Sequence, residues 1–163
     1  EGRKQGGRII YDRPENPFKS VRKAELSRKA EEHLKNSLYY SDLIVAGPST
    51  MAIAGAFFDK PVALVGFDGY QERSYYRSIR RYYDYNHWEP ALKSGGVKLA
   101  ESKDEFLAAI KDYLAHPEKD REARKKLAEA QCWRTDGKST ERLFNVTRKW
   151  AGFRWHYQSH AIF

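Results

Sequence analysis

The sequence predicts an α/β fold in which helices flank a mainly parallel β-sheet. The runs DLIVAG at 42–47 and PVALVGF at 61–67 are continuously apolar, which is the pattern of strands buried on both faces. A stretch of small residues at 50–58 lies between these runs and is predicted to be helical. Strands that alternate with helices form parallel sheets, because the helix returns the chain to the edge where the strand began.

The other predicted elements continue this alternation along the chain. Apolar residues four apart, among them Leu34 and Leu38, predict a helix over about 21–39. Ser102 and Glu105 form a capping box that opens a helix ending near residue 115. Only four strands are legible, so we expect an edge of the sheet or a partner domain to be missing. The remaining predictions are strands at 8–12 and 97–100, and helices at 72–83, 119–131 and 138–150.

Composition places the chain among single-domain globular proteins. It has 163 residues, of which 40% are hydrophobic and 32% charged, and this balance excludes a disordered or fibrous chain. No apolar run approaches the roughly 20 residues of a membrane span, and the polar first residues are not a secretory signal. The single cysteine, Cys132, excludes an internal disulfide and a cysteine-based zinc cluster. We therefore expect a cytoplasmic location and no metal site.

The net charge of +8 predicts an anionic partner. Nucleic acid, phosphorylated ligands and anionic lipid headgroups all meet this requirement, and charge alone does not choose among them. The sequence carries no RNA-recognition, KH or zinc-finger signature, so a specific nucleic-acid partner is not expected.

The sequence GPST at 47–50 stands where the first apolar run meets the following helix. A helix after a parallel strand points its free N–H groups at the carboxyl edge of the sheet, an arrangement that binds phosphate. The donors here would be the N–H groups of Ser49, Thr50 and Met51, together with two hydroxyl groups, in a loop opened by Gly47. The alternative is that Ser49 only caps the helix. Neither GxxxxGK(S/T) nor GxGxxG is present, which argues against generic triphosphate and dinucleotide sites.

Two longer stretches resemble a known group of enzymes. SDLIVAGPSTMAIAGAFFDKPVALVGFDG, at 41–69, resembles the C-terminal, donor-binding half of GT-B glycosyltransferases, above all those of bacterial surface polysaccharides. That group shades into poly(glycerol-phosphate) transferases of the CDP-glycerol type. The stretch GGVKLAESKDEFLAAIKDYLAHPEKDREARKKLAEAQCWRTDGKSTERL continues the resemblance, which spans about residues 38–145. It implies a Rossmann-like parallel sheet flanked by helices, as half of a GT-B architecture.

The resemblance also implies a ligand and a place for it. The ligand would be a nucleotide-sugar or a CDP-linked donor, which is a substrate and not a cofactor. Ser49 and Thr50 would contact its diphosphate, and Asp68 and Gly69, at the end of the next strand, would lie near the sugar or nucleoside. For Asp68 the alternative is an ordinary turn residue. GT-B enzymes have an N-terminal acceptor domain, which is not seen here, so we expect a fragment that does not turn over alone.

Residues 70–88 combine tyrosines with arginines. On the helix predicted at 72–83, Arg77 belongs to a basic face and Tyr75 to an aromatic one. One interpretation is a core-facing aromatic stripe with a solvated basic face. The other is that the helix borders the cleft, where Arg77 meets phosphate. His87 is either an acid/base or phosphate-contacting group or a structural histidine.

The turn DGKST at 136–140 opens the last predicted helix. Lys138 and this helix start would face the same cleft, unless Asp136 is only an N-cap. We divide the chain into a linker at 1–7, a nucleotide-binding domain at 8–150 and an aromatic tail at 151–163. The tail is expected to pack on the missing N-terminal domain or on membrane-interface lipid.

These inferences lead to one main functional interpretation. The chain is expected to be the donor-binding half of a glycosyltransferase that builds a surface polysaccharide, located in the cytoplasm or at the inner membrane face. The first alternative is a glycerol-phosphate transferase with a CDP-linked donor. The second is a non-enzymatic basic module that binds nucleic acid or another polyanion, and a scaffold without chemistry also remains open.

Overall fold

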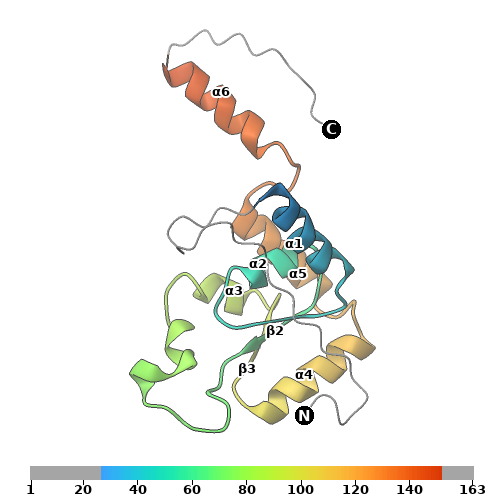
Figure 1. Cartoon of the computed structure of the whole chain (residues 1–163), viewed down its shortest axis with the longest axis vertical. Coiled ribbons are helices and arrows are strands. Elements are labelled where there is room, and N and C mark those ends of the chain that lie inside the picture. The colour runs from blue at the N-terminus through green and yellow to red at the C-terminus, as the bar shows by residue number, and fades with distance from the viewer. Residues whose placement is uncertain (1–26, 152–163) are drawn as a thin grey trace.

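The computed structural model describes residues 27–151, which form an α/β domain around a three-stranded parallel sheet (Figure 1). The strands are β1 (Ile44–Ala46), β2 (Val62–Val65) and β3 (Lys98–Ala100), and they lie in the order β1-β2-β3. The register pairs Val45 with Ala63 and Leu64 with Leu99. The predicted fold class is confirmed. The linker at 1–7, the strand at 8–12 and the tail beyond residue 151 lie outside the described residues.

Helices cover both faces of this sheet. α2 (Met51–Phe57) packs against β1 and β2, and α5 (Arg121–Cys132) packs against α2. α4 (Lys103–Ala115) packs against β2 and β3 from the other side (Figure 1). α1 (Arg28–Tyr40) starts later than predicted, because Ser27 is extended and caps it by accepting a hydrogen bond from Ala30 N. The main core joins strands and helices through the buried residues Leu38, Ile44, Ala52, Ala56, Val62, Leu64 and Leu127.

Small residues bring α2 unusually close to the sheet. Ala52 and Ala56 are buried in the core. A Cβ atom on Gly55 would lie 2.6 Å from Val62 Cγ2 and 2.9 Å from Ile44 Cδ1, which is closer than packed carbon atoms approach. Only glycine fits at this crossing, so the composition of α2 sets its distance from β1 and β2.

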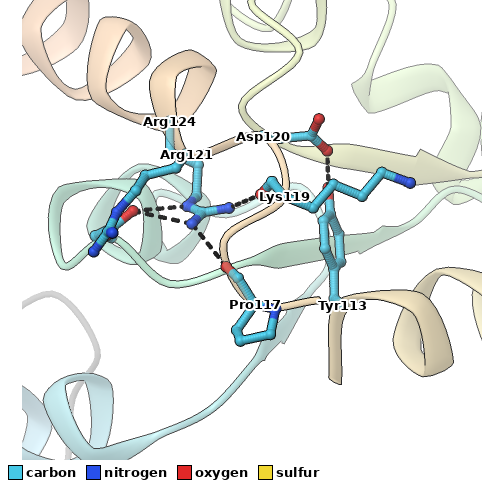
Figure 2. Close-up of polar contacts among 7 residues, drawn as sticks. Tyr113, Pro117, Lys119, Asp120, Arg121 and Arg124 are labelled. Atoms are coloured by element: carbon cyan, nitrogen blue, oxygen red, sulfur yellow. Dashed lines mark hydrogen bonds and ion pairs between the residues drawn. The ribbon is translucent and has the colours of Figure 1, made fainter. Parts of the chain in front are cut away.

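A buried arginine joins α5 to the turn after α2. The Arg124 side chain is 1% exposed, and its Nε atom donates to Asp59 Oδ1 at 3.1 Å. Its Nη2 atom donates to Pro117 O at 3.0 Å, and its Nη1 atom donates to Lys119 O (Figure 2). Arg121 binds the other oxygen of Asp59 at 2.6 Å. The guanidinium group therefore ties the α4–α5 connection to the base of α2.

The prediction of a helix at 72–83 is wrong. The segment forms two short 3₁₀ turns, η3 (Tyr75–Arg77) and η4 (Ile79–Tyr82), separated by the extended and buried Ser78. Asp68 accepts hydrogen bonds from the N–H groups of Arg73 and Ile79, and Ser78 Oγ accepts one from Arg80 N. These side chains replace the helical acceptors, which is how Asp and Ser compete with a helix.

Two further helices complete the described chain. α3 (Glu89–Lys93) was not predicted, although a glutamate and a proline in its first turn are a helix-start signal. α6 (Ser139–Ala151) confirms the last predicted helix and stands apart from the other helices in Figure 1. Its apolar side chains are largely exposed, at 65% for Leu143, 54% for Val146 and 85% for Trp150.

Candidate functional site

Three connections meet at the carboxyl edge of the sheet. The parallel strands β1, β2 and β3 end there at Ala46, Val65 and Ala100. α2 and α4 begin at the same edge, because each follows a strand with only a short connection. Ligands of open parallel sheets bind at this edge, so the topology places the predicted loop where a ligand can reach it.

The loop at 47–51 offers two of the three N–H donors that the sequence predicted, because the N–H group of Met51 is used within the loop. Within residues 27–151, the N–H groups of Ser49 and Thr50 have no hydrogen-bond acceptor, and neither does the exposed Thr50 hydroxyl. The Ser49 hydroxyl accepts a hydrogen bond from Met51 N at 3.3 Å, and Ser49 O accepts one from Ala52 N. Ser49 thus acts as a cap, while two backbone donors of the loop stay available to a ligand.

Asp68 uses both carboxylate oxygens within the chain. Oδ1 accepts from Ile79 N at 2.9 Å, Oδ2 accepts from Arg73 N at 3.3 Å, and the Arg80 guanidinium lies 3.9 Å from Oδ2. Its side chain is 5% exposed. The hydrogen bond from Ile79 N is the main reason that the pKa of Asp68 is lowered, and burial opposes it. Asp68 therefore organises the loop that follows Gly69, which has φ of +80°.

A cleft of about 280 Å³ lies between the ends of β2 and β3. Its floor includes the start of α4, where Ser102 Oγ accepts from Glu105 N at 3.2 Å and Glu105 Oε2 accepts from Glu101 N at 2.9 Å. The Ser102 half of the predicted capping box is confirmed, whereas Glu105 reaches back to the residue before the cap. The cleft contains three acidic and two cationic side chains, and it is lined by Phe67, Asp68, Gly69, Gln71, Glu72, Arg80, Glu101, Ser102 and Lys103.

Residues 70–88 border the predicted loop, although not as a helix. Ile79 Cδ1 lies 3.6 Å from the position that a Cβ atom on Gly47 would take, so η4 packs against the start of the loop. The Tyr83 hydroxyl donates to Val65 O at 2.9 Å, its ring packs edge-to-face on Trp88, and burial raises its pKa to about 12. The interpretation of the tyrosines as core-facing therefore applies to Tyr83. η4, in contrast, borders the loop at 47–51.

The other predicted site residues are not joined to this loop by any interaction within residues 27–151. Arg77 is exposed at the end of η3. His87 is exposed, and its ring lies against those of Tyr85 and Trp88. Lys138 N donates to Asp136 Oδ1 at 3.1 Å, which is the capping alternative for this turn.

Arg142 completes the Asp136 turn. It binds Asp136 through two hydrogen bonds of 2.9 Å and lowers the pKa of that carboxyl to about 2. Both carboxylate oxygens of Asp136 are thus bound by groups at the start of α6.

Of the two cations of the cleft, sequence reasoning missed Lys103 and expected Arg80 only as part of the basic face of a helix at 72–83. Arg80 was visible only as one arginine among four in the 70–88 segment. Lys103 follows the capping serine directly, and this position after a strand was an available signal. No group of three potential metal ligands occurs in the part of the chain that the structure describes.

Comparisons with known proteins identify one family. A family model described as CDP-glycerol:poly(glycerophosphate) glycerophosphotransferase matches residues 14–148. No curated protein and no solved structure matches the chain. Among residues 27–151, the structure contains no helix with both the length and the apolar character needed to cross a membrane.

Proposed function

Because the chain belongs to the CDP-glycerol:poly(glycerophosphate) glycerophosphotransferase family, we propose that it binds CDP-glycerol for transfer of glycerol phosphate to a growing polymer. This was the alternative interpretation of the sequence, and the family match favours it over glycosyl transfer. The match covers residues 14–148, so it includes the strand–loop–helix and the 70–88 segment. A transferase family also weighs against a purely non-enzymatic polyanion-binding module.

The change of donor changes the bond that is broken. Glycosyl transfer cleaves a carbon–oxygen bond at the sugar and releases a nucleoside diphosphate. Glycerophosphate transfer cleaves the P–O bond between the two phosphoryl groups of CDP-glycerol. A hydroxyl oxygen of the acceptor attacks the phosphorus that carries glycerol, CMP leaves, and the hydroxyl proton passes to a base or to solvent. Negative charge then develops on the CMP phosphate, where backbone N–H donors would stabilise it.

The observation that carries the assignment of the site is the pair of free donors at Ser49 and Thr50. Both N–H groups lack acceptors within residues 27–151, and they stand at the carboxyl edge beside the exposed Thr50 hydroxyl. In this proposal the loop at 47–51 holds the diphosphate. The neighbouring cleft beside Gly69 takes one end of the donor, with Arg80 and Lys103 as the cations nearest to it.

The test is NMR titration of the 163-residue chain with CDP-glycerol, CDP, UDP and UDP-glucose, at low and high salt. We expect CDP-glycerol to shift the amides of residues 47–51 and 68–69 at both salt concentrations. Ser49→Ala/Thr50→Ala should weaken its binding about tenfold, because a hydroxyl and a cap are lost at a charged ligand.

Ser27→Ala is the matched control, because Ser27 also caps a helix, through Ala30 N at 3.2 Å. It should reduce stability without changing the affinity for CDP-glycerol. Preferential binding of UDP-glucose would return the assignment to glycosyl transfer. Equal binding of all four nucleotides along 70–88, abolished by salt, would contradict a donor site at the loop.

A further inference from the structure

We propose that the exposed tyrosine–arginine surface of residues 70–85 binds the acceptor, a flexible chain of polyol units joined by phosphates. The identity of this polymer rests on the proposed function, whereas the surface itself rests on geometry. The tyrosine–arginine surface is defined as Tyr70, Arg73, Tyr75, Tyr76, Arg77, Tyr82 and Tyr85.

Aromatic exposure is concentrated on this surface. Five tyrosines within it are exposed, from 39% for Tyr82 to 79% for Tyr76 and 90% for Tyr70. Single exposed apolar residues are normal on proteins, but four of these rings lie in contact in two pairs, Tyr75 with Tyr76 and Tyr82 with Tyr85, and clustered exposed rings mark an interaction site. Tyrosine combines an apolar ring with a hydroxyl donor, which suits a ligand with both carbon-bound hydrogens and phosphate oxygens.

The charges of the segment leave two guanidinium groups for a ligand. Arg80 is engaged by Glu72 and Asp68. In contrast, the side chains of Arg73 and Arg77 have no hydrogen bond or ion pair within residues 27–151. Both are exposed. Two free guanidinium groups on one loop can each bind a phosphate with charge-assisted hydrogen bonds.

The acidic groups of the segment are already paired. Glu72 Oε1 lies 3.5 Å from Arg80 Nη2, and Asp84 Oδ2 accepts a hydrogen bond from the Tyr75 hydroxyl at 2.8 Å. Within residues 70–85 four arginines stand against two acidic side chains, and this excess of positive charge favours a polyanion.

The surface is held in shape before any ligand arrives. The Asp68 carboxylate fixes the N–H groups of Arg73 and Ile79, and the Tyr83 hydroxyl fixes the other end of the segment to Val65 O. Ser78 is buried between the two 3₁₀ turns. A preorganised surface loses less conformational entropy when it binds a flexible polymer.

The surface also adjoins the proposed donor site. η4 packs on the loop through Ile79, whose Cδ1 atom lies beside Gly47. A chain bound along residues 70–85 would therefore have its end near the loop at 47–51, where the transferred phosphoryl group is proposed to lie.

Ring geometry favours a polyol phosphate over nucleic acid. The rings of Tyr75 and Tyr76 meet at 78° and those of Tyr82 and Tyr85 at 81°. Successive bases of a single strand stack on aromatic faces, and perpendicular neighbours do not offer two such faces in one direction. A polyol phosphate chain has no base to stack, so perpendicular rings do not hinder it.

The experiment measures binding of a fluorescent glycerol phosphate oligomer and of CDP-glycerol to the same variants of the full chain. Arg73→Ala/Arg77→Ala is expected to weaken oligomer binding about tenfold and to lower the dependence of log affinity on log salt concentration by about two. Tyr76→Ala should weaken it about threefold. Neither variant should alter the affinity for CDP-glycerol by more than about twofold, because none of the three residues belongs to the proposed donor site.

Matched controls lie elsewhere on the chain. Lys125→Ala/Lys126→Ala also removes two positive charges, but from the exposed side of α5. Tyr40→Ala removes a tyrosine that is 77% exposed and also lies edge-to-face against its neighbour, as Tyr76 does. The proposal requires that both controls bind the oligomer like the wild type.

Several outcomes overturn the proposal. One is that the α5 control weakens oligomer binding equally, which would show that the effect depends on net charge alone. Another is tighter binding of oligothymidylate with the same number of phosphates. A third is binding of phosphatidylglycerol vesicles that depends on Arg73 and Arg77 when oligomer binding does not. Failure of CDP-glycerol to bind the wild type would instead refute the proposed function, on which the acceptor's identity rests.

Discussion

Asp59 shows how much of the fold depends on single residues. It has a positive φ of 55°, a conformation that Asn and Asp tolerate better than other side chains with a Cβ. Its carboxylate binds Arg121 and Arg124, which differ greatly in exposure, at 65% and 1% of the side chain. The same ion-pair chemistry therefore occurs once at the surface and once in the core, and the two pairs provide a direct comparison of their energies.

Arg124→Lys is predicted to lower the free energy of unfolding by about 3 kcal/mol, because an ammonium group cannot reach three acceptors that a planar guanidinium satisfies. Arg121→Lys, at the exposed partner of the same aspartate, should lower it by less than about 1 kcal/mol. Urea denaturation of both variants measures the difference. Equal effects would mean that the buried hydrogen bonds to Pro117 O and Lys119 O contribute little.

Asp68 gives the fold a dependence on acid pH. Its pKa is lowered from the ordinary value of 3.8, chiefly by the hydrogen bond from Ile79 N. A lowered folded-state pKa stabilises the native state above the unfolded-state pKa, and this contribution disappears as pH falls through the folded value. We expect hydrogen exchange at Ile79 N, corrected for the intrinsic rate, to speed up in that range.

Asp68→Asn is the control for this titration. Asparagine keeps one acceptor oxygen for Ile79 N but has no carboxyl to protonate, so the corrected exchange rate at Ile79 N should not change between pH 5 and about pH 3. Unchanged protection of Ile79 N in wild type at low pH would show that the protonated carboxyl still holds the loop.

At the scale of elements, packing of α2 against the sheet depends on Gly55. Gly55→Ala is predicted to lower the free energy of unfolding by about 1–3 kcal/mol, because the new methyl group would overlap Val62 and Ile44. It should also weaken CDP-glycerol binding, since α2 carries the loop at 47–51. Calorimetry and nucleotide titration of the same sample check both effects.

Gly47→Ala is the matched substitution for stability. A methyl group there would meet only Ile79 Cδ1 at 3.6 Å, which is an ordinary contact. It should change the free energy of unfolding by less than about 0.5 kcal/mol. A loss as large as that of Gly55→Ala would point to a backbone effect of glycine removal instead of overlap.

The elements that sequence reasoning predicted correctly are those whose signals are local. The capping box of Ser102 and Glu105 marks the start of α4, and continuous apolar runs mark β1 and β2. The 72–83 segment failed because its helical spacing was overruled by Asp68, whose hydrogen bond to Ile79 N spans 11 residues. Sequence periodicity does not register such an acceptor.

The candidate site likewise has one part that local sequence signals predict and one part that they did not. The loop at 47–51 follows from the strand–loop–helix pattern, because any parallel strand brings its following loop to the carboxyl edge. Lys103 follows the capping serine of α4, so its place at this edge could have been predicted from the same local pattern. Arg80 reaches the cleft from a segment whose path depends on hydrogen bonds to Asp68, and the helical spacing did not predict that path.

At the scale of the whole molecule, burial is uneven. Leu127 on α5 is 1% exposed, whereas Leu143 on α6 is 65% exposed. The apolar face of α6 is thus largely exposed within residues 27–151, and the packing of the aromatic tail on an N-terminal domain stays a prediction.

Leu127→Ala and Leu143→Ala test this difference in burial with the same substitution at two positions. The first should lower the free energy of unfolding by about 2–5 kcal/mol, because it leaves a cavity in the core. The second should change it by less than about 0.5 kcal/mol. Thermal denaturation of the 163-residue chain compares them. A large effect at Leu143 would mean that α6 is packed against other residues in solution.

The ion pair between Asp59 and Arg124 has a consequence for the order in which the chain acquires its structure during synthesis. The two residues are 65 positions apart. The strand, the loop at 47–51 and α2 leave the ribosome well before α5, so the turn at the base of α2 has no arginine to bind while the nascent chain is still short. The proposed donor loop is thus synthesised early, but the ion pair that anchors α2 behind it forms only after α5 has been synthesised. A pause in translation before residue 124 would leave its supporting helix exposed to proteases.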